Sequence, residues 1–206
     1  HNYQVALETK EETSVNRLET VALSVPGVAA VESWQVNRAR ARPISQTDAA
    51  VTDARGTVFG QPPETTMYLP ELVAGRWLQA GDSYGVVVGR QISEKESWSV
   101  GDQIRLTNSD LQELTVQIVG IHFDPVDGTS LHIPLSVLQA EWAGNGMANS
   151  VWIRTTQPDA AFQKEIARDL KRAYEREGII IEPKSPYADG ENTIAEISAR
   201  LATGLS

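Results

Sequence analysis

Residues 81–85 are the first place where residue types suggest catalysis, because their sequence GDSYG fits G-x-S-x-G, the pattern around the nucleophilic serine of many hydrolases. That pattern requires the serine to leave a strand and enter a helix. Residues 75–80 contain no run of β-branched residues, whereas the three valines at 86–88 are a strong strand signal. The elements therefore occur in the opposite order, and we interpret Ser83 as a turn residue ahead of a buried strand.

Two histidines and an aspartate could in principle ligate a metal ion across a second turn. His122 and Asp124 precede this turn and His132 follows it. If Asp124 pairs with Thr129 in a hairpin, His132 falls opposite Ile121, and the two imidazole rings point to opposite faces. A shift of one residue would bring the rings together. Because such residues on a hairpin more often decorate a surface than bind zinc, we predict no metal site.

Three arginines alternate along one expected strand and therefore project from one face of it. Arg38, Arg40 and Arg42 are candidates for docking an acidic partner or lipid head groups. The alternative is a solvated strand face or a protected sheet edge, because charged side chains deter strand pairing. Runs of charge usually mark solvated surface, which favours this alternative.

Composition excludes several classes of function. The 206 residues carry a net charge of −9, which argues against binding to nucleic acid, since that requires clustered Lys and Arg. The chain has no cysteine, and this excludes disulfides, thiolate metal sites and cysteine nucleophiles. The phosphate-binding pattern G-x-x-x-x-G-K-[ST] is also absent. These absences remove thiol, disulfide and phosphate-loop chemistry from the functions open to the chain.

The first part of the chain shows a strand, a capped helix and a second strand. Alternation over residues 3–9 predicts a strand, and Thr9 with Glu12 forms a T-x-x-E capping box. The helix that follows ends at Pro26-Gly27. Extended segments come next.

The last part of the chain repeats this order. Residues 150–156 predict a strand, and Thr156 with Asp159 forms a second cap for an amphipathic helix. Gly178 ends that helix, and residues 179–185 predict another strand. Two such units predict a split βαβ sheet with helices on one face.

The segment between these parts has a different sequence pattern, with short predicted strands, many glycines and turns. We therefore predict an α+β fold with two subdomains. Residues 1–62 plus 150–206 form a discontinuous α/β subdomain, and residues 63–149 form an inserted, small β-rich subdomain.

The final segment, residues 191–206, has a narrow apolar stripe at helical spacing that should contact a partner helix. The stripe continues to the last residue and the sequence begins with His1, so we expect a fragment of a longer protein. No apolar stretch approaches the ~20 residues that a membrane-spanning helix needs.

Several motifs in a fixed order resemble the extracytoplasmic core domain of MacB-type ABC transporter permeases, a superfamily that includes LolC, LolE and FtsX-like permeases. The pattern is an L-x-x-G-R segment, an acidic turn, a V-V-V-G strand, a short helix, V-G-D-x-I-x-L and V-x-G-I. These motifs fall on Leu72, Gly75, Arg76, Asp82, Val86–Gly89, Val100–Leu106 and Val119–Ile121.

The resemblance implies a domain between the first two transmembrane helices of a permease, on the extracytoplasmic side of the membrane. It implies a porter-like subdomain made from both chain ends. It also implies a domain that is not an enzyme, with no catalytic residue, no cofactor-binding residue and no metal ligand. The implied partners are a cytoplasmic ATPase, reached through the membrane helices, and a second permease protomer. An extracytoplasmic protein or lipoprotein is a further possible partner. ATP-driven motion would be transmitted to substrate export or to that partner, as in MacB-like mechanotransmission.

Two other classes of function stay open at this point. A stand-alone secreted ligand-binding or adaptor module would have no membrane partner, and a serine hydrolase would use Ser83. Apolar segments of ~20 residues directly before and after the sequence would favour the permease interpretation over the adaptor. The sequence does not identify what is transported.

Overall fold

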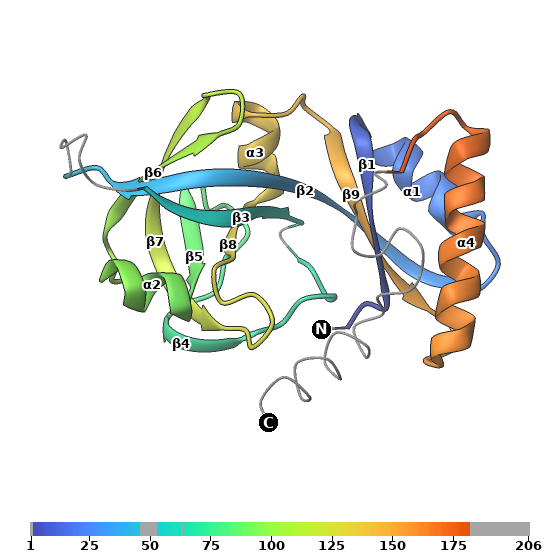
Figure 1. Ribbon diagram of the computed structural model, residues 1–206, viewed down its shortest axis with the longest axis horizontal. Helices are drawn as coiled ribbons and strands as arrows, with labels where there is room; N and C mark the ends of the chain where they lie inside the picture. The colour runs from blue at the N-terminus through green and yellow to red at the C-terminus, as the bar shows by residue number, and fades with distance from the viewer. Residues whose placement is uncertain (1, 46–52, 63, 182–206) are drawn as a thin grey trace. The chain divides into compact units, whose positions relative to one another are not determined.

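The computed structural model of the chain describes residues 2–45, 53–62 and 64–181. The described residues form nine strands and four helices of mixed α+β structure, as predicted (Figure 1). They belong to two compact units. The first, here called the terminal unit, comprises His1–Trp34, Thr65–Leu69 and Gly146–Ser206; the second, the central unit, comprises Gln35–Glu64 and Pro70–Asn145.

The terminal unit is built on three strands. β9 (Met147–Thr155) lies between β1 (Val5–Ser14) and the first part of β2 (Val28–Pro43), and it is antiparallel to both. β1 and β2 therefore run parallel to each other. Leu7 pairs with Val151 near the middle of the β1–β9 ladder.

Two helices pack on one face of this sheet, α1 (Val15–Leu23) and α4 (Ala160–Arg176) (Figure 1). Their apolar stripes and the inward residues of the strands form one core, which includes Leu7, Leu18, Val21, Ile153, Ile166, Leu170 and Tyr174. The hydroxyl of Tyr174 donates a hydrogen bond of 2.8 Å to the carbonyl of Leu18, which joins the two helices inside this core.

Both helices begin three or more residues later than the sequence predicts. The cap of α1 is Ser14, whose Oγ accepts from the amide of Arg17, so the capping box expected at Thr9 and Glu12 is wrong. Strand pairing prevails at Thr9, which bridges to Ile181 beside β1.

Asp159 itself caps α4, by accepting a hydrogen bond of 2.9 Å from the amide of Phe162. Thr156, the first residue of the predicted cap, instead donates its amide to the carbonyl of Gly27. The backbone pairing of β9 thus continues one residue past the strand. Gly178 has a φ of 73° and follows the end of α4, as predicted, because glycine adopts this conformation without strain.

Six strands close into a barrel in the central unit. Around the ring they are the second part of β2, β3 (Ala54–Gln61), β8 (Leu131–Pro134), β5 (Gly85–Gly89), β7 (Glu113–Phe123) and β6 (Gln103–Asn108), which pairs with β2 again. The β3–β8 and β5–β7 pairs are parallel, and the others are antiparallel. Because the ring is closed, each of its six strands pairs with a neighbour on both sides. A further strand, β4 (Glu71–Gly75), pairs with β7 outside the ring.

The barrel interior is filled by alternate residues of its strands. Val86 and Val88 of β5 point inward, and so do Leu131 and Ile133 of β8. The short helices α2 (Arg90–Glu96) and α3 (Leu135–Glu141) add Ile92 and Leu138 to the same core. Each such fully buried side chain contributes roughly 1.5–3 kcal/mol, which makes the barrel the main source of stability in this unit.

These units divide the chain differently from the expected ranges 1–62 plus 150–206 and 63–149. Residues 35–62 group with the central segment, because β2 and β3 pair there with β6 and β8. None of the helices in the described ranges has both the length and the apolar character needed to span a membrane. The helix expected over residues 191–206 and most of the strand expected over 179–185 lie outside the described residues.

Candidate functional site

The GDSYG segment forms a turn held by one ion pair. Two of the guanidinium nitrogens of Arg76 donate to the carboxylate of Asp82, at 2.8 Å for Nη1–Oδ2 and 2.8 Å for Nη2–Oδ1. Asp82 also accepts from the amide of Gln79 at 2.9 Å. The hydrogen bonds from Arg76 lower the pKa of Asp82, so the carboxylate stays charged. Ser83 is exposed in the bend and leads into β5, which fits the predicted turn.

Two glycines explain why this segment lies so close to β7. A Cβ on Gly75, which has a φ of 68°, would meet the carbonyl oxygen of Val119. A Cβ on Gly120 would meet the carbonyl oxygen of Arg76. The two backbone segments lie so close that the amide of Arg76 donates a hydrogen bond of 3.0 Å to the carbonyl of Val119. The glycines of the L-x-x-G-R and V-x-G-I motifs are thus required for packing.

The hairpin expected between His122 and His132 is wrong. β7 and β8 do not pair with each other, because β5 lies between them: Gly89 is opposite His122 and Val87 is opposite His132. The rings therefore lie on the same side, with centroids 5.0 Å apart and planes at 84°. Asp124 does not pair with Thr129 but accepts from the amide of Val126 at 2.8 Å within the turn.

The two imidazoles are fully enclosed by aromatic and polar neighbours. Trp77 lies 5.9 Å from His122 and 5.4 Å from His132, and Phe59 stacks on His132 at 5.2 Å. His122 Nε2 is 3.1 Å from the hydroxyl of Ser130. Burial lowers the pKa of His122 to about 4, and burial together with the neighbouring His122 lowers the pKa of His132 well below its ordinary value. Both rings are neutral at physiological pH.

No group of three or more His, Cys, Asp or Glu residues that could hold a metal ion occurs in the described ranges. The histidine pair instead has the surroundings of packed core residues.

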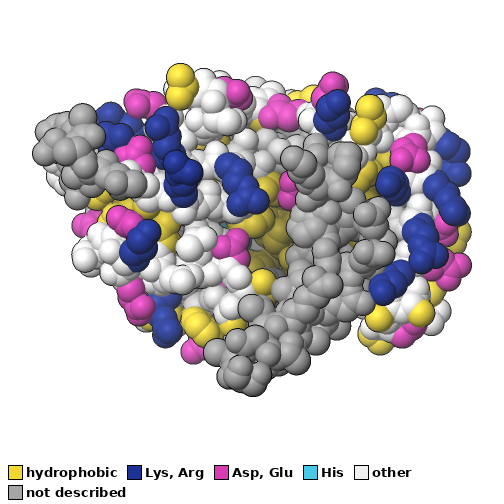
Figure 2. Space-filling model, viewed as in Figure 1, with side chains coloured by type: hydrophobic (Ala, Val, Ile, Leu, Met, Phe, Trp, Pro, Cys, Tyr) yellow, Lys and Arg dark blue, Asp and Glu magenta, His cyan; other side chains and the backbone are white. Residues whose placement is uncertain are grey.

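The arginine face of β2 is the remaining candidate. Arg38, Arg40 and Arg42 alternate with the buried residues Ala39 and Ala41, so they project from the outer side of the barrel, as predicted. Figure 2 shows basic side chains gathered over this part of the molecule, in the upper left of the view.

Cross-strand partners separate these three arginines into two kinds. Arg42 pairs with Asp53 at 2.8 Å, and this hydrogen-bonded contact raises the pKa of the guanidinium. Arg40 is farther from the same carboxylate, at 3.9 Å, and lies directly opposite Arg55 of β3. Arg38 donates to the hydroxyl of Thr57 at 3.2 Å. Asp53 thus pairs closely with Arg42 and more weakly with Arg40, whereas Arg38 and Arg55 form no ion pair with a residue that the structure describes.

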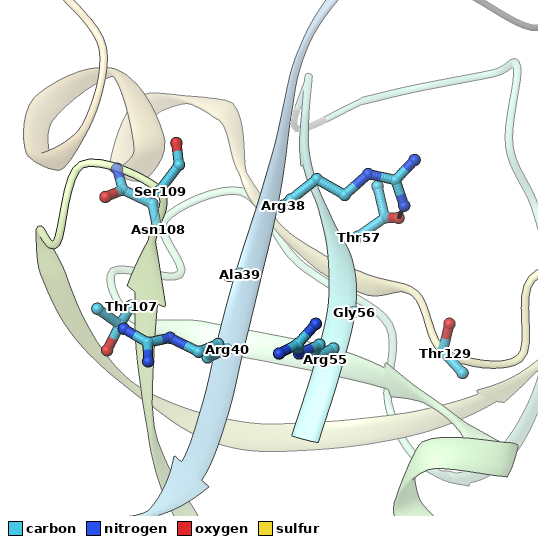
Figure 3. Close-up of a pocket in the computed structure, with 10 residues that line it drawn as sticks. All are labelled: Arg38, Ala39, Arg40, Arg55, Gly56, Thr57, Thr107, Asn108, Ser109 and Thr129. Carbon is cyan, nitrogen blue, oxygen red and sulfur yellow. Dashed lines mark hydrogen bonds between the residues drawn. The ribbon is translucent and has the colours of Figure 1, made fainter. Parts of the chain in front are cut away.

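A pocket of about 400 Å³ opens on this face (Figure 3). In Figure 3, Arg38 extends toward Thr57 and Arg40 extends toward Thr107, on opposite sides of β2. Its lining residues are Arg38, Ala39, Arg40, Arg55, Gly56, Thr57, Thr107, Asn108, Ser109 and Thr129. Of the three predicted docking residues, the pocket therefore includes two and leaves out Arg42.

Sequence reasoning missed Arg55 and the hydroxyl groups around it. Arg55 and Thr57 alternate in β3 as the arginines do in β2, but their meeting depends on a register that brings Arg40 opposite Arg55. Thr107 comes from β6, which reaches β2 only because the barrel closes. The alternation was visible in the sequence, and the register was not.

Comparisons with known proteins agree with this fold. The model of the MacB-like periplasmic core domain family matches residues 3–169. The periplasmic region of MacB from Actinobacillus actinomycetemcomitans aligns with a TM-score of 0.58 and 11% identity, over 88% of each chain. The extracellular domain of the noncanonic ABC-type transporter YknZ from Gram-positive bacteria aligns with a TM-score of 0.55 and 16% identity, over 88% of this chain and 100% of the other. A comparison with curated proteins gives no match.

Proposed function

Because the chain belongs to the family of MacB-like periplasmic core domains, we propose that it transmits ATP-driven motion from a permease to substrate export or to an extracytoplasmic partner. It is an extracytoplasmic domain of a MacB-like ABC transporter permease. The family is a class of transporter domains and is not a known class of enzyme.

The observation that carries this proposal is the span of the family match, residues 3–169, which takes in both compact units. The motif residues support it. Arg76, Asp82, Gly75 and Gly120 fix the backbone beside β7. A part that transmits motion must resist deformation, and a closed, densely packed barrel does so.

The proposed partners are a cytoplasmic ATPase, reached through the membrane helices, and a second permease protomer. An extracytoplasmic protein or lipoprotein is a third partner. We propose no catalytic role for Ser83, which is an exposed turn residue.

Distance measurements in the complete transporter test the transmission of motion. The 206 residues contain no cysteine, and any cysteine elsewhere in the transporter is first replaced. A single cysteine is then placed at one exposed position in each unit, Glu165→Cys on α4 or Thr115→Cys on β7. Each labelled permease is assembled with its ATPase in nanodiscs. Double electron–electron resonance then measures the distance between the two copies of the label, without nucleotide and with trapped ATP.

We expect the distance distribution to shift with ATP at one or both positions. An ATPase-dead transporter that still binds ATP is the control for nucleotide binding alone. Unchanged distributions at both positions, in a transporter that hydrolyses ATP and exports its substrate, would contradict the proposal.

A further inference from the structure

We propose that the pocket between Arg38, Arg40 and Arg55 binds a phosphoryl group. This inference goes beyond the transmission of motion, because it concerns a ligand of the central unit and holds whether or not the unit moves. The pocket volume of about 400 Å³ accommodates a phosphate or pyrophosphate together with part of the molecule that carries it.

Electrostatics within the barrel wall favours an anion here. Arg40 and Arg55 are directly opposite each other on antiparallel strands, an arrangement in which like charges destabilise the sheet. Arg55 and Arg38 make no ion pair with any residue in the described ranges, in contrast to Arg42 with Asp53 and Arg105 with Glu113. A bound anion would relieve this repulsion.

The charge of the face differs in sign from that of the chain. Five arginines lie on this wall: Arg38, Arg40, Arg42, Arg55 and Arg105. Three carboxylates interact with them, those of Asp53, Glu113 and Asp127, the last through its electrostatic coupling to Arg38. A local excess of two positive charges on a chain of net charge −9 is a place where an anionic ligand is attracted.

The donor set favours a phosphoryl group over a carboxylate. A guanidinium fork matches the geometry of phosphate oxygens, and pyrophosphate presents enough oxygens to be bound by more than one of these arginines, although Arg38 and Arg40 extend to opposite sides of β2. The hydroxyls of Thr107 and Ser109 stand at the rim and have no hydrogen bond to a described residue. Thr57 already accepts from Arg38, so its hydroxyl hydrogen is available to a ligand oxygen.

Binding of pyrophosphate to the 206-residue chain tests the proposal. Isothermal titration calorimetry in a phosphate-free buffer of low ionic strength should show saturable binding. The double variant Arg40→Gln/Arg55→Gln should bind at least about tenfold more weakly, because charge-assisted hydrogen bonds are lost. The control Arg105→Gln removes a charge from the same face but from outside the pocket, and it should change the affinity less than about twofold.

Thermal unfolding gives a second measurement, both without and with the ligand. Without ligand, the double variant should unfold at the same temperature as the parent chain or higher, because a repulsive pair is gone. With pyrophosphate, the parent and Arg105→Gln should gain stability and the double variant should not.

Vesicles identify the source of the phosphoryl group. Cosedimentation with phosphatidylglycerol vesicles, competed by pyrophosphate and absent with phosphatidylcholine, would assign a lipid head group. Binding of pyrophosphate without vesicle binding would assign a soluble phosphorylated compound. Either result supports the proposal.

Three results would overturn it. The first is the absence of saturable pyrophosphate binding. The second is an equal loss of binding in the double variant and in Arg105→Gln. The third is binding of polyglutamate without binding of pyrophosphate, which would assign the face to an acidic polypeptide.

Discussion

His122 and His132 face each other across β5 with ring centroids 5.0 Å apart, and neither ring is exposed to solvent. Their strands are not neighbours, and the contact exists because Gly89 and Val87 of the strand between them pair with one histidine each. The first prediction concerns what acid does to this pair.

Acidification should destabilise the central unit below neutral pH. The pKa of His122 is about 4 in the folded chain, below the ordinary value of 6.5, so the unfolded chain binds more protons between these values. The contribution of His122 to the free energy of unfolding is therefore fully present above about pH 6.5, and it is lost progressively as the pH falls toward 4. For His122 alone the loss by pH 5 is roughly 2 kcal/mol. Urea unfolding at several pH values measures it.

The variants His122→Gln and His132→Gln provide the control for this pH dependence. Each should flatten the curve of unfolding free energy against pH between 4 and 6.5, whatever its effect at pH 7.5. A curve of unchanged slope in both variants would show that other groups cause the acid sensitivity.

Alanine at Gly120 should destabilise the chain strongly. Its Cβ would overlap the carbonyl oxygen of Arg76, a backbone atom that cannot move without breaking the contact with β7. We expect a loss of about 3 kcal/mol in the free energy of unfolding, typical of forced overpacking. The matched variant is Gly101→Ala, where a Cβ meets no atom within 4 Å and only the φ of 101° opposes the side chain. If both substitutions cost the same, close packing is not the reason for glycine at 120.

The substitution Tyr174→Phe should weaken the contact between α1 and α4. The substitution removes the hydrogen bond of 2.8 Å to the carbonyl of Leu18, inside a core where Tyr174 is 0% exposed. We expect a loss of about 1 kcal/mol, the usual net contribution of an intramolecular hydrogen bond. Tyr84→Phe is the control, because its bond to Glu141 lies at the surface, and it should stay within about 0.5 kcal/mol of the parent.

Asparagine at Asp82 should loosen the turn before β5. The change leaves Arg76 without its charged partner and weakens the acceptor for Gln79. The urea midpoint should fall, and the difference from the parent should shrink in high salt, because much of this ion pair is open to solvent. Ser83→Ala in the same turn should leave the midpoint unchanged. A salt-independent effect of Asp82→Asn would point to the hydrogen-bond geometry alone.

Local signals predicted local structure well. The valines at 86–88 form the buried strand β5, and Gly178 follows the end of α4 as expected. The cap at Thr9 was mispredicted because a strand partner from the far end of the chain, Ile181, competes for that backbone. Capping boxes are recognised within four residues, and such competition is invisible there.

The candidate site was partly predictable for the same reason. Alternation identified Arg38, Arg40 and Arg42 as one face. Which of them is neutralised depends on the neighbouring strands, which bring Asp53 to Arg42 and Arg55 to Arg40. Register between distant strands is set by the whole fold, so residues on one strand cannot specify it. The contact between His122 and His132 likewise depends on strand pairing that neither of their own strands can specify.

Barrel closure also sets an order of events during synthesis. All six strands of the ring come from residues 35–134, so the barrel can close as soon as this stretch has emerged. β1, which precedes the barrel strands in the sequence, has no strand partner until β9 is made, after the barrel is complete. Nascent chains should therefore acquire a protease-resistant central core while their N-terminal strand is still unpaired and accessible to chaperones.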